Sequence, residues 1–160
     1  MGYQAFADAA ADAGVDGVLT VDLPPEEADD LLQALRPHQI DPILLLAPTS
    51  TLDRIKSVSD VASGFIYYVS MKGITGGGNI ILSEVGAKVA EIRRNVNVPI
   101  GIGFGIRDAD SAQMMAQVGD AVIVGSVLVD MVDRLEDTPE EIGPEIARML
   151  RSMREAMDLI

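Results

Sequence analysis

Two short apolar segments that end beside glycine are the part of this sequence best suited to chemistry. One spans residues 98–103 and the other 121–124, and each stops just before a predicted helix. Glycine permits a sharp turn and lets a ligand reach the main chain, and a helix that begins beyond it presents unpaired N–H groups to an anion. The N–H groups of Gly105 and Ser126 are therefore predicted to bind a phosphate, although a turn glycine and a helix cap would look the same.

The composition limits the kinds of partner. The chain has 160 residues, 48% of them apolar, and a formal net charge of −13. We expect a single domain over residues 1–160 with an aliphatic core. A surface this acidic repels nucleic acid and anionic lipid, and neither is expected as a partner. The chain has no cysteine, which excludes disulfides, thiolate metal sites and a cysteine nucleophile. No metal or cofactor is expected, and without a signal peptide or membrane span a cytoplasmic location is the default.

Hydrophobic periodicity and capping residues divide the chain into alternating strands and helices. The predicted strands cover residues 17–22, 42–46, 65–70, 98–103 and 121–124. The predicted helices cover 2–13, 25–35, a stretch capped by Thr49 or Ser50, a stretch through 82–92, one capped by Asp108 or Asp110, 126–134, and one after Pro139. Methionines on the last helix are interpreted as core packing. His38 is placed in a polar loop, solvated and inert.

Strands that are apolar throughout are buried on both faces, which predicts a parallel sheet. A doubly wound nucleotide-binding sheet puts its glycine-rich turn after the first strand, but here the first turn is Asp22-Leu23-Pro24-Pro25. The glycines crowd the last three strand ends instead, as in a (β/α)8 barrel. The fold class predicted is α/β: a parallel, five-stranded, incomplete (β/α)8 TIM barrel with outer helices.

The order of several motifs resembles the tryptophan synthase α chain, a family that cleaves indole-3-glycerol phosphate to indole and glyceraldehyde 3-phosphate. The motifs are the segments 14–27, 67–70 with 73–76, 103–106, and 125–126. The resemblance covers nearly the whole chain and implies barrel strands four to eight. Met1 would then be an internal position of an ordinary family member.

The resemblance implies the residues of a substrate site. Those implied to hold the phosphate are Gly76, Gly103, Phe104, Gly105, Gly125 and Ser126, and those implied to line the cavity are Tyr67, Thr75 and Asp22. Tyr67 is equally well interpreted as a core tyrosine. The loop with Thr75 and Gly76 would be a substrate lid or a floppy connection. Asp22, at a strand end, would be structural or a site contact rather than a general base.

The resemblance also limits the expected activity. The family's catalytic glutamate and aspartate come from its second strand and the loop after it, a region outside this sequence. No catalytic residue is therefore assigned, and the chain alone is expected to be inactive while still binding a small phosphorylated ligand weakly. Two alternatives stay open: a structural barrel piece that forms homo-oligomers through exposed edges, and one half of a split enzyme. The family's β-chain partner is expected to bind poorly.

Overall fold

Five parallel strands in chain order form the centre of the computed structural model, which describes residues 1–70, 78–103 and 105–160. The strands are β1 (Gly17–Leu19), β2 (Asp41–Leu46), β3 (Ile66–Val69), β4 (Ile100–Gly103) and β5 (Ala121–Ile123). The helices are α1 (Tyr3–Asp12), α2 (Asp29–Leu35), α3 (Leu52–Val61), α4 (Gly78–Arg93), α5 (Ala109–Ala116), α6 (Ser126–Arg134) and α7 (Pro139–Met157). Two short 3₁₀ turns, η1 (Pro25–Glu27) and η2 (Arg36–His38), flank α2.

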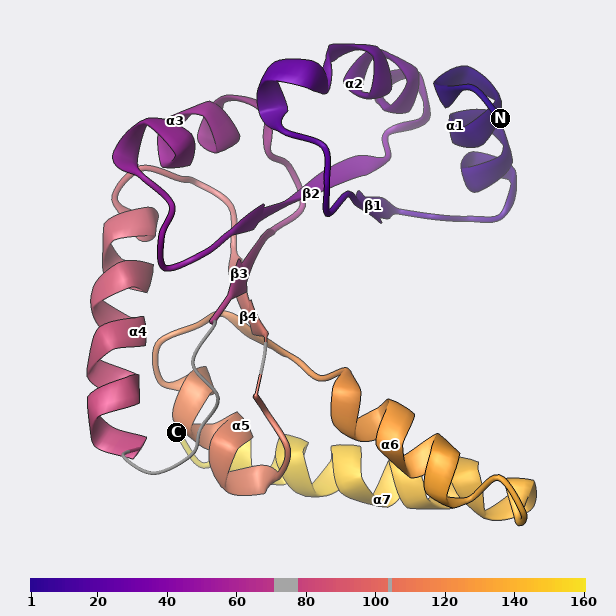
Figure 1. The fold of residues 1–160 in the computed structure, drawn as a ribbon, viewed down its shortest axis with the longest axis vertical. Helices are drawn as coiled ribbons and strands as arrows, with labels where there is room; N and C mark the ends of the chain where they lie inside the picture. The colour runs from indigo at the N-terminus through magenta and orange to yellow at the C-terminus, as the bar shows by residue number, and fades with distance from the viewer. Residues whose placement is uncertain (71–77, 104) are drawn as a thin grey trace.

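The sheet is open rather than closed. Each strand pairs with the next one along the chain, and the outer strands β1 and β5 each pair on one side only within the described part of the chain. The ribbon curls into a C shape, with α1 and α2 at one end and α6 and α7 projecting from the other (Figure 1). The prediction of a five-stranded parallel, incomplete barrel is confirmed.

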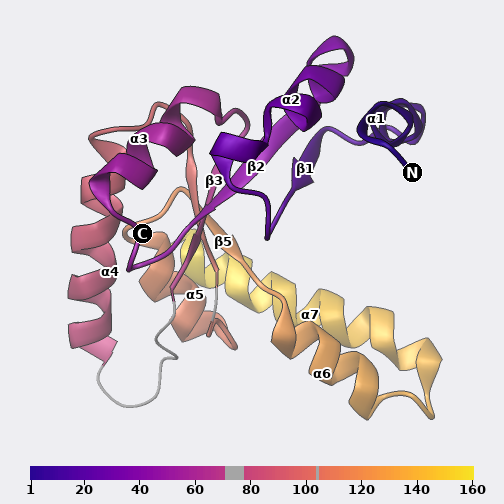
Figure 2. The same ribbon diagram turned by 45° about the horizontal axis from the view of Figure 1, so that its top comes forward.

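Helices cover the convex face of the sheet, with α3 and α4 beside one another (Figures 1 and 2). Alternate residues of β3 and β4 point toward these helices, because successive side chains of a strand face opposite ways. Ile66, Tyr68, Ile100 and Ile102 are all at most 1% exposed and form the main core. Burial raises the pKa of the Tyr68 hydroxyl, and Glu84 adds to that rise. The main core therefore lies between sheet and helices.

A second, smaller core joins α1 to α2. It contains Ala7, Ala10, Leu31, Ala34, Leu35 and Ile40. A polar contact supports it, because His38 Nε2 lies 2.9 Å from Asp8 Oδ1. His38 was expected to be solvated in a polar loop; it lies in the 3₁₀ turn η2, where its side chain, 25% exposed, contacts Asp8 of α1.

Two details of the helix boundaries differ from the sequence-based expectation or refine it. Thr51 caps α3, because its hydroxyl accepts from Arg54 N–H at 3.3 Å. Thr49 or Ser50 was expected in that role, which was wrong: the Ser50 hydroxyl accepts from Ala47 N–H in the preceding turn. Of the two aspartates considered for α5, Asp108 is the cap. The methionines of α7 pack as expected: Met153 is buried, and Met149 and Met157 lie against the main core.

Candidate functional site

The carboxyl ends of β4 and β5 lie side by side. Gly103, the last residue of β4, pairs in register with Ile123, the last residue of β5. Gly105 lies two residues after the end of β4, and Ser126 three residues after the end of β5. The structure therefore brings together the two segments from which the sequence predicted an anion site, and places both at the edge where barrel enzymes carry their active sites.

Gly103 lies beneath the ring of Tyr67. A Cβ added to Gly103 would stand 2.6 Å from the Tyr67 Cζ atom and 2.8 Å from its Cε1 atom. Gly101 is similar, since a Cβ there would stand 2.9 Å from Ile123 Cδ1 and 3.3 Å from the Phe65 ring. These side chains face the concave side of the sheet, opposite the main core. Tyr67 is half-buried on that side.

Gly105 adopts a left-handed backbone conformation, with φ at +77°. Glycine takes this conformation without the clash that a Cβ would introduce. The next residues fold into the start of α5, where Asp108 Oδ1 accepts from Ser111 N–H at 2.8 Å and the Ser111 hydroxyl accepts from Asp108 N–H. Hydrogen bonds from Ser111 lower the pKa of Asp108. The side chains of Asp108 and Ser111 thus cap the amino end of α5.

The amino end of α6 is different. Gly125 is its N-cap, and no side chain accepts a hydrogen bond there. Gly125 and Ser126 are both exposed, and a Cβ at Gly125 would meet nothing within 4 Å. The first N–H groups of a helix have no partner inside it, and the helix dipole makes this end favourable for an anion. Unlike α3 and α5, but like α1, α2 and α7, this helix has no side-chain cap, so its first amides are available to an external acceptor.

The remaining predicted site residues are not all in this group. Asp22 is exposed in the turn after β1, so three strands separate it from β5 and Ser126. The structure does not bring it together with the glycines of β4 and α6. Phe104, Thr75 and Gly76 lie outside the described residues. Within the described ranges, no three histidine, aspartate or glutamate side chains gather to hold a metal ion.

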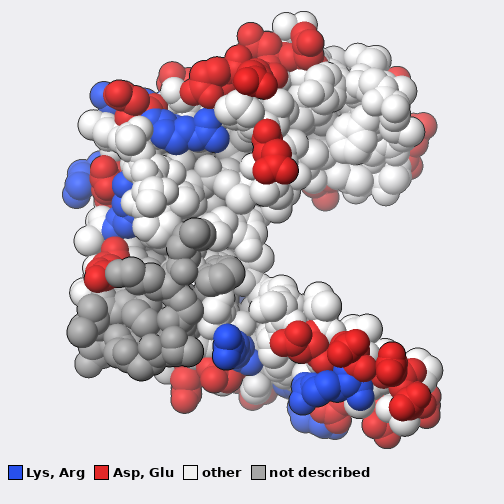
Figure 3. Space-filling view, viewed as in Figure 1, with Lys and Arg blue, Asp and Glu red and all other residues white. Residues whose placement is uncertain are grey.

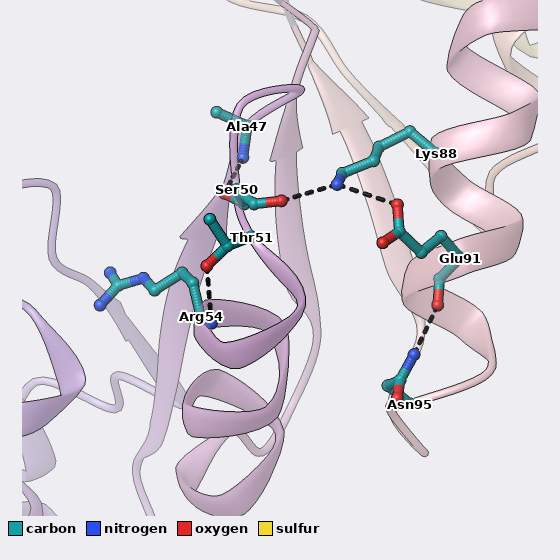
Figure 4. A network of polar contacts seen from close by, with 7 residues as sticks. All are labelled: Ala47, Ser50, Thr51, Arg54, Lys88, Glu91 and Asn95. Atoms are coloured by element: carbon teal, nitrogen blue, oxygen red, sulfur yellow. Dashed lines mark hydrogen bonds and ion pairs between the residues drawn. The ribbon is translucent and has the colours of Figure 1, made fainter.

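Sequence reasoning missed a polar connection between the loop after β2 and helix α4. Lys88 Nζ donates to the Ser50 carbonyl oxygen at 2.7 Å and to Glu91 Oε2 at 2.9 Å (Figure 4). Asn95 continues it at the end of α4, where its side chain donates to the Glu91 carbonyl and its carbonyl accepts from Ser59. These contacts hold α3 and the loop before it against α4. The sequence itself shows only a lysine next to Val89 of α4, and it gives no partner for that lysine.

Charge is unevenly distributed over the molecule. In Figure 3 acidic and basic side chains gather on the outer parts of the two arms, whereas the recess between them is lined mainly by uncharged surface. None of the helices in the described part of the chain is long and apolar enough to cross a membrane.

Comparison with known proteins identifies the family. A profile of the tryptophan synthase alpha chain family matches residues 1–158. The chain belongs to the tryptophan synthase alpha chain family. It is 56% identical over 158 residues to the tryptophan synthase alpha chain of Thioalkalivibrio sulfidiphilus and 54% identical to that of Marinobacter nauticus. In each case 99% of this chain is covered but only 59% and 58% of the relative. The match is to the C-terminal portion of the family.

Solved structures of the tryptophan synthase alpha chain share the fold. The alpha subunit from Legionella pneumophila has a TM-score of 0.87 at 34% identity, and the match covers 99% of this chain and 58% of that one. A structure described as the α2β2 complex from Pyrococcus furiosus has a TM-score of 0.83 at 26% identity, covering 96% and 61%. The five strands therefore curve as the corresponding part of a complete barrel does.

Proposed function

We propose that these 160 residues carry the phosphate-holding half of a tryptophan synthase alpha-type lyase site, in tryptophan biosynthesis. The ligand is a small phosphorylated molecule, either indole-3-glycerol phosphate or its product glyceraldehyde 3-phosphate. The observation that carries the proposal is the pairing of Gly103 with Ile123, which places the ends of β4 and β5 beside each other. Gly105 and the uncapped amino end of α6 follow these ends.

The chemistry of the site supports an anionic ligand held by backbone rather than by side-chain cations. The net charge of −13 gives no general attraction for a phosphate, so local N–H groups must provide the binding. We assign the phosphate to Gly76, Gly103, Phe104, Gly105, Gly125 and Ser126, with Tyr67 and Thr75 toward the rest of the substrate. Asp22, in the turn after β1, lines the cavity only if a bound substrate reaches that side of the complete barrel.

We also propose that this chain by itself does not cleave indole-3-glycerol phosphate. Cleavage needs two positioned carboxyl groups, one to protonate the indole ring and one to accept a proton. The family supplies both from a region outside these residues. The 160 residues are therefore expected to bind phosphate without releasing indole from indole-3-glycerol phosphate. We propose equally that docking of the family's β chain is weak.

Titration with inorganic phosphate, followed by amide chemical shifts, tests the binding. Shifts that saturate at Gly105 and Ser126 are expected, with none at Gly14, a glycine of similar backbone conformation at the end of α1. Equal responses at Gly14 and Gly105 would refute the assignment. Indole release by the purified chain, measured beside an active alpha chain, tests the lack of turnover.

A second candidate function is a structural, self-associating barrel piece with no ligand. The exposed apolar side chains near the two outer strands favour it, among them Leu19 and Val21 at β1 and Val129 and Val132 on α6. Exposed apolar patches commonly become contact surfaces. Sedimentation at several concentrations distinguishes the two functions: a stable monomer that binds phosphate excludes this candidate.

A further inference from the structure

A cavity of about 360 Å³ lies at the amino ends of β2 and β3, at the opposite end of the sheet from the turn that carries Gly105. Its lining residues come from the end of α2, from η2, from the start of β2 and from the end of α3. Because β2 and β3 each pair on both sides, the cavity is bounded by neighbouring elements of this chain and does not depend on the outer strands. Its volume suits a small molecule.

The inner lining of the cavity is apolar. It is supplied by Leu32, Leu35, Ile40, Pro42 and Val61. Leu35 is 1% exposed and Ile40 is 4% exposed, and both belong to the smaller core that joins α1 to α2. Packing on their other side therefore fixes these two side chains, and the surface that they give to the cavity suits an aliphatic group of a ligand.

Two lining residues of opposite charge do not pair with each other. Arg36, in η2, and Asp60, near the end of α3, both line the cavity and are exposed. Neither takes part in an ion pair or a side-chain hydrogen bond within the described part of the chain. By contrast, the guanidinium groups of Arg54, Arg93 and Arg148 each contact a carboxylate. The charges of Arg36 and Asp60 thus lie apart on one cavity, where an anionic and a cationic group of a single ligand can reach them.

The backbone at the end of α3 adds a preference for a cation beside Asp60. The carbonyl groups of Asp60 and Val61 accept no hydrogen bond from the described residues, because the last carbonyl groups of a helix have no partner inside it. The negative end of the helix dipole also favours a positive charge. An ammonium group at this end of the cavity can therefore contact both the Asp60 carboxylate and carbonyl oxygens of the helix.

The other side of the cavity suits an anion. The Arg36 guanidinium can bind a carboxylate through two parallel hydrogen bonds. Gln39 lines the cavity three residues later and adds an amide donor. Its φ of +57° is the one positive value at a non-glycine residue in the described ranges. Backbone strain of this kind gathers at ligand-binding sites, which agrees with a site at this turn.

We propose that this cavity binds a free α-amino acid with an aliphatic side chain. The ammonium group of the ligand contacts Asp60 and the end of α3, its carboxylate contacts Arg36 and Gln39, and its side chain packs on the aliphatic lining. A ligand without an ammonium group would leave Asp60 unpaired, and a ligand without a carboxylate would leave Arg36 unpaired, so a molecule with both charges fits best. This ligand is separate from the proposed phosphate, which belongs to the opposite end of the sheet.

Three probes that differ in charge test the site: L-leucine, 3-methylbutylamine, which lacks the carboxylate, and 4-methylpentanoate, which lacks the ammonium group. Amide chemical shifts of the 160-residue chain are expected to saturate at Gln39 and Ser63 with L-leucine. Each analogue should bind at least about tenfold more weakly, because it loses the hydrogen bonds of one charged group. Equal binding of the three probes, or the lack of a saturable shift with L-leucine, would overturn the proposal.

Matched variants assign each charge to its residue. In Arg36→Gln, L-leucine should bind about tenfold more weakly, whereas 3-methylbutylamine binds as before. In Asp60→Asn, L-leucine should again bind about tenfold more weakly, whereas 4-methylpentanoate binds no more weakly than to the wild type. Both side chains are exposed, so each variant is expected to fold, and circular dichroism verifies this.

Arg94→Gln and Asp53→Asn are the controls, because they replace an exposed arginine and an exposed aspartate outside the cavity. Both should bind L-leucine as the wild type does. If Arg94→Gln weakens binding as much as Arg36→Gln, the guanidinium of Arg36 is not the group that holds the carboxylate, and the proposed site is wrong.

Discussion

The ring of Tyr67 lies across the Cα atom of Gly103, so the last residue of β4 has no room for a side chain. The two residues belong to neighbouring strands, and their contact is on the concave face beside the proposed phosphate site. Packing at this point connects Tyr67 of β3 to the strand end that precedes Gly105.

Gly103→Ala should therefore destabilise the fold through overpacking, by about 1–3 kcal/mol. Urea unfolding measures this cost. In a Tyr67→Ala background the same substitution should cost less than about 1 kcal/mol, because the clashing ring is gone and the two changes are coupled. If Gly103→Ala destabilises the protein equally with and without the Tyr67 ring, the ring is not what excludes a side chain at position 103.

Gly105→Ala and Gly14→Ala form a matched pair, since φ is +77° at Gly105 and +76° at Gly14. Each should lose about 1–2 kcal/mol of stability, the cost of a Cβ in the left-handed region. Only Gly105→Ala should also weaken phosphate binding in the titration. Loss of binding in both variants would indicate a general effect of destabilisation rather than a local one.

Asp120 connects three elements at the opposite end of the sheet. Its carboxylate accepts from the buried Ile100 N–H at 2.8 Å and from Arg93 at 3.0 Å. Asp120→Ala leaves the Ile100 N–H without this partner and should cost about 1–3 kcal/mol. Asp137→Asn, in the exposed loop between α6 and α7, should have little effect on the urea midpoint.

The cost of Asp120→Ala should depend on pH. Desolvation opposes ionisation of Asp120, but the hydrogen bonds from Arg93 and Ile100 outweigh it and lower its pKa below the ordinary 3.8. A lowered pKa contributes stability above the unfolded-state value and loses it as pH falls through the folded-state value. The stability difference between the wild type and the variant should therefore be constant near neutral pH and shrink below pH 3.8. A difference that grows with acid would contradict this assignment.

Lys88→Met removes the donor that joins α4 to the Ser50 carbonyl, and Lys56→Met removes an exposed lysine of α3 as its control. The Lys88 side chain is only 15% exposed, so loss of its hydrogen bond should cost about 1–3 kcal/mol, as for a hydrogen bond to a charged group. Thermal unfolding of both variants provides the comparison. An equal shift in midpoint for the two would show that the connection in Figure 4 contributes nothing.

Local sequence signals located the elements well, because the apolar runs and turn residues act over a few positions. All five strands and the order of the helices followed from them. The cap of α5 was narrowed to Asp108 or Asp110, and the structure shows that it is Asp108. The prediction of Thr49 or Ser50 as the cap of α3 was wrong because three hydroxyl residues follow one another there: Ser50 serves the turn at Ala47, and Thr51 caps the helix.

Contacts between distant residues were beyond this reasoning. The position of Tyr67 over Gly103 depends on strand register, and the bond from Lys88 to Ser50 joins residues 38 positions apart. His38 likewise finds Asp8 30 positions away. The site residues themselves came from the family resemblance, and their roles stay predictions until phosphate binding is measured.

The division into two cores has a consequence for the order of unfolding. Among the described residues, the cluster of α1 and α2 shares no member with the larger one, and the pairing of β1 with β2 is the strand pairing that joins those parts. Cooperative units of this kind open separately. Native-state proteolysis should therefore release the first forty or so residues before the rest, leaving a four-stranded remnant in which β3 and β4 are the last to open.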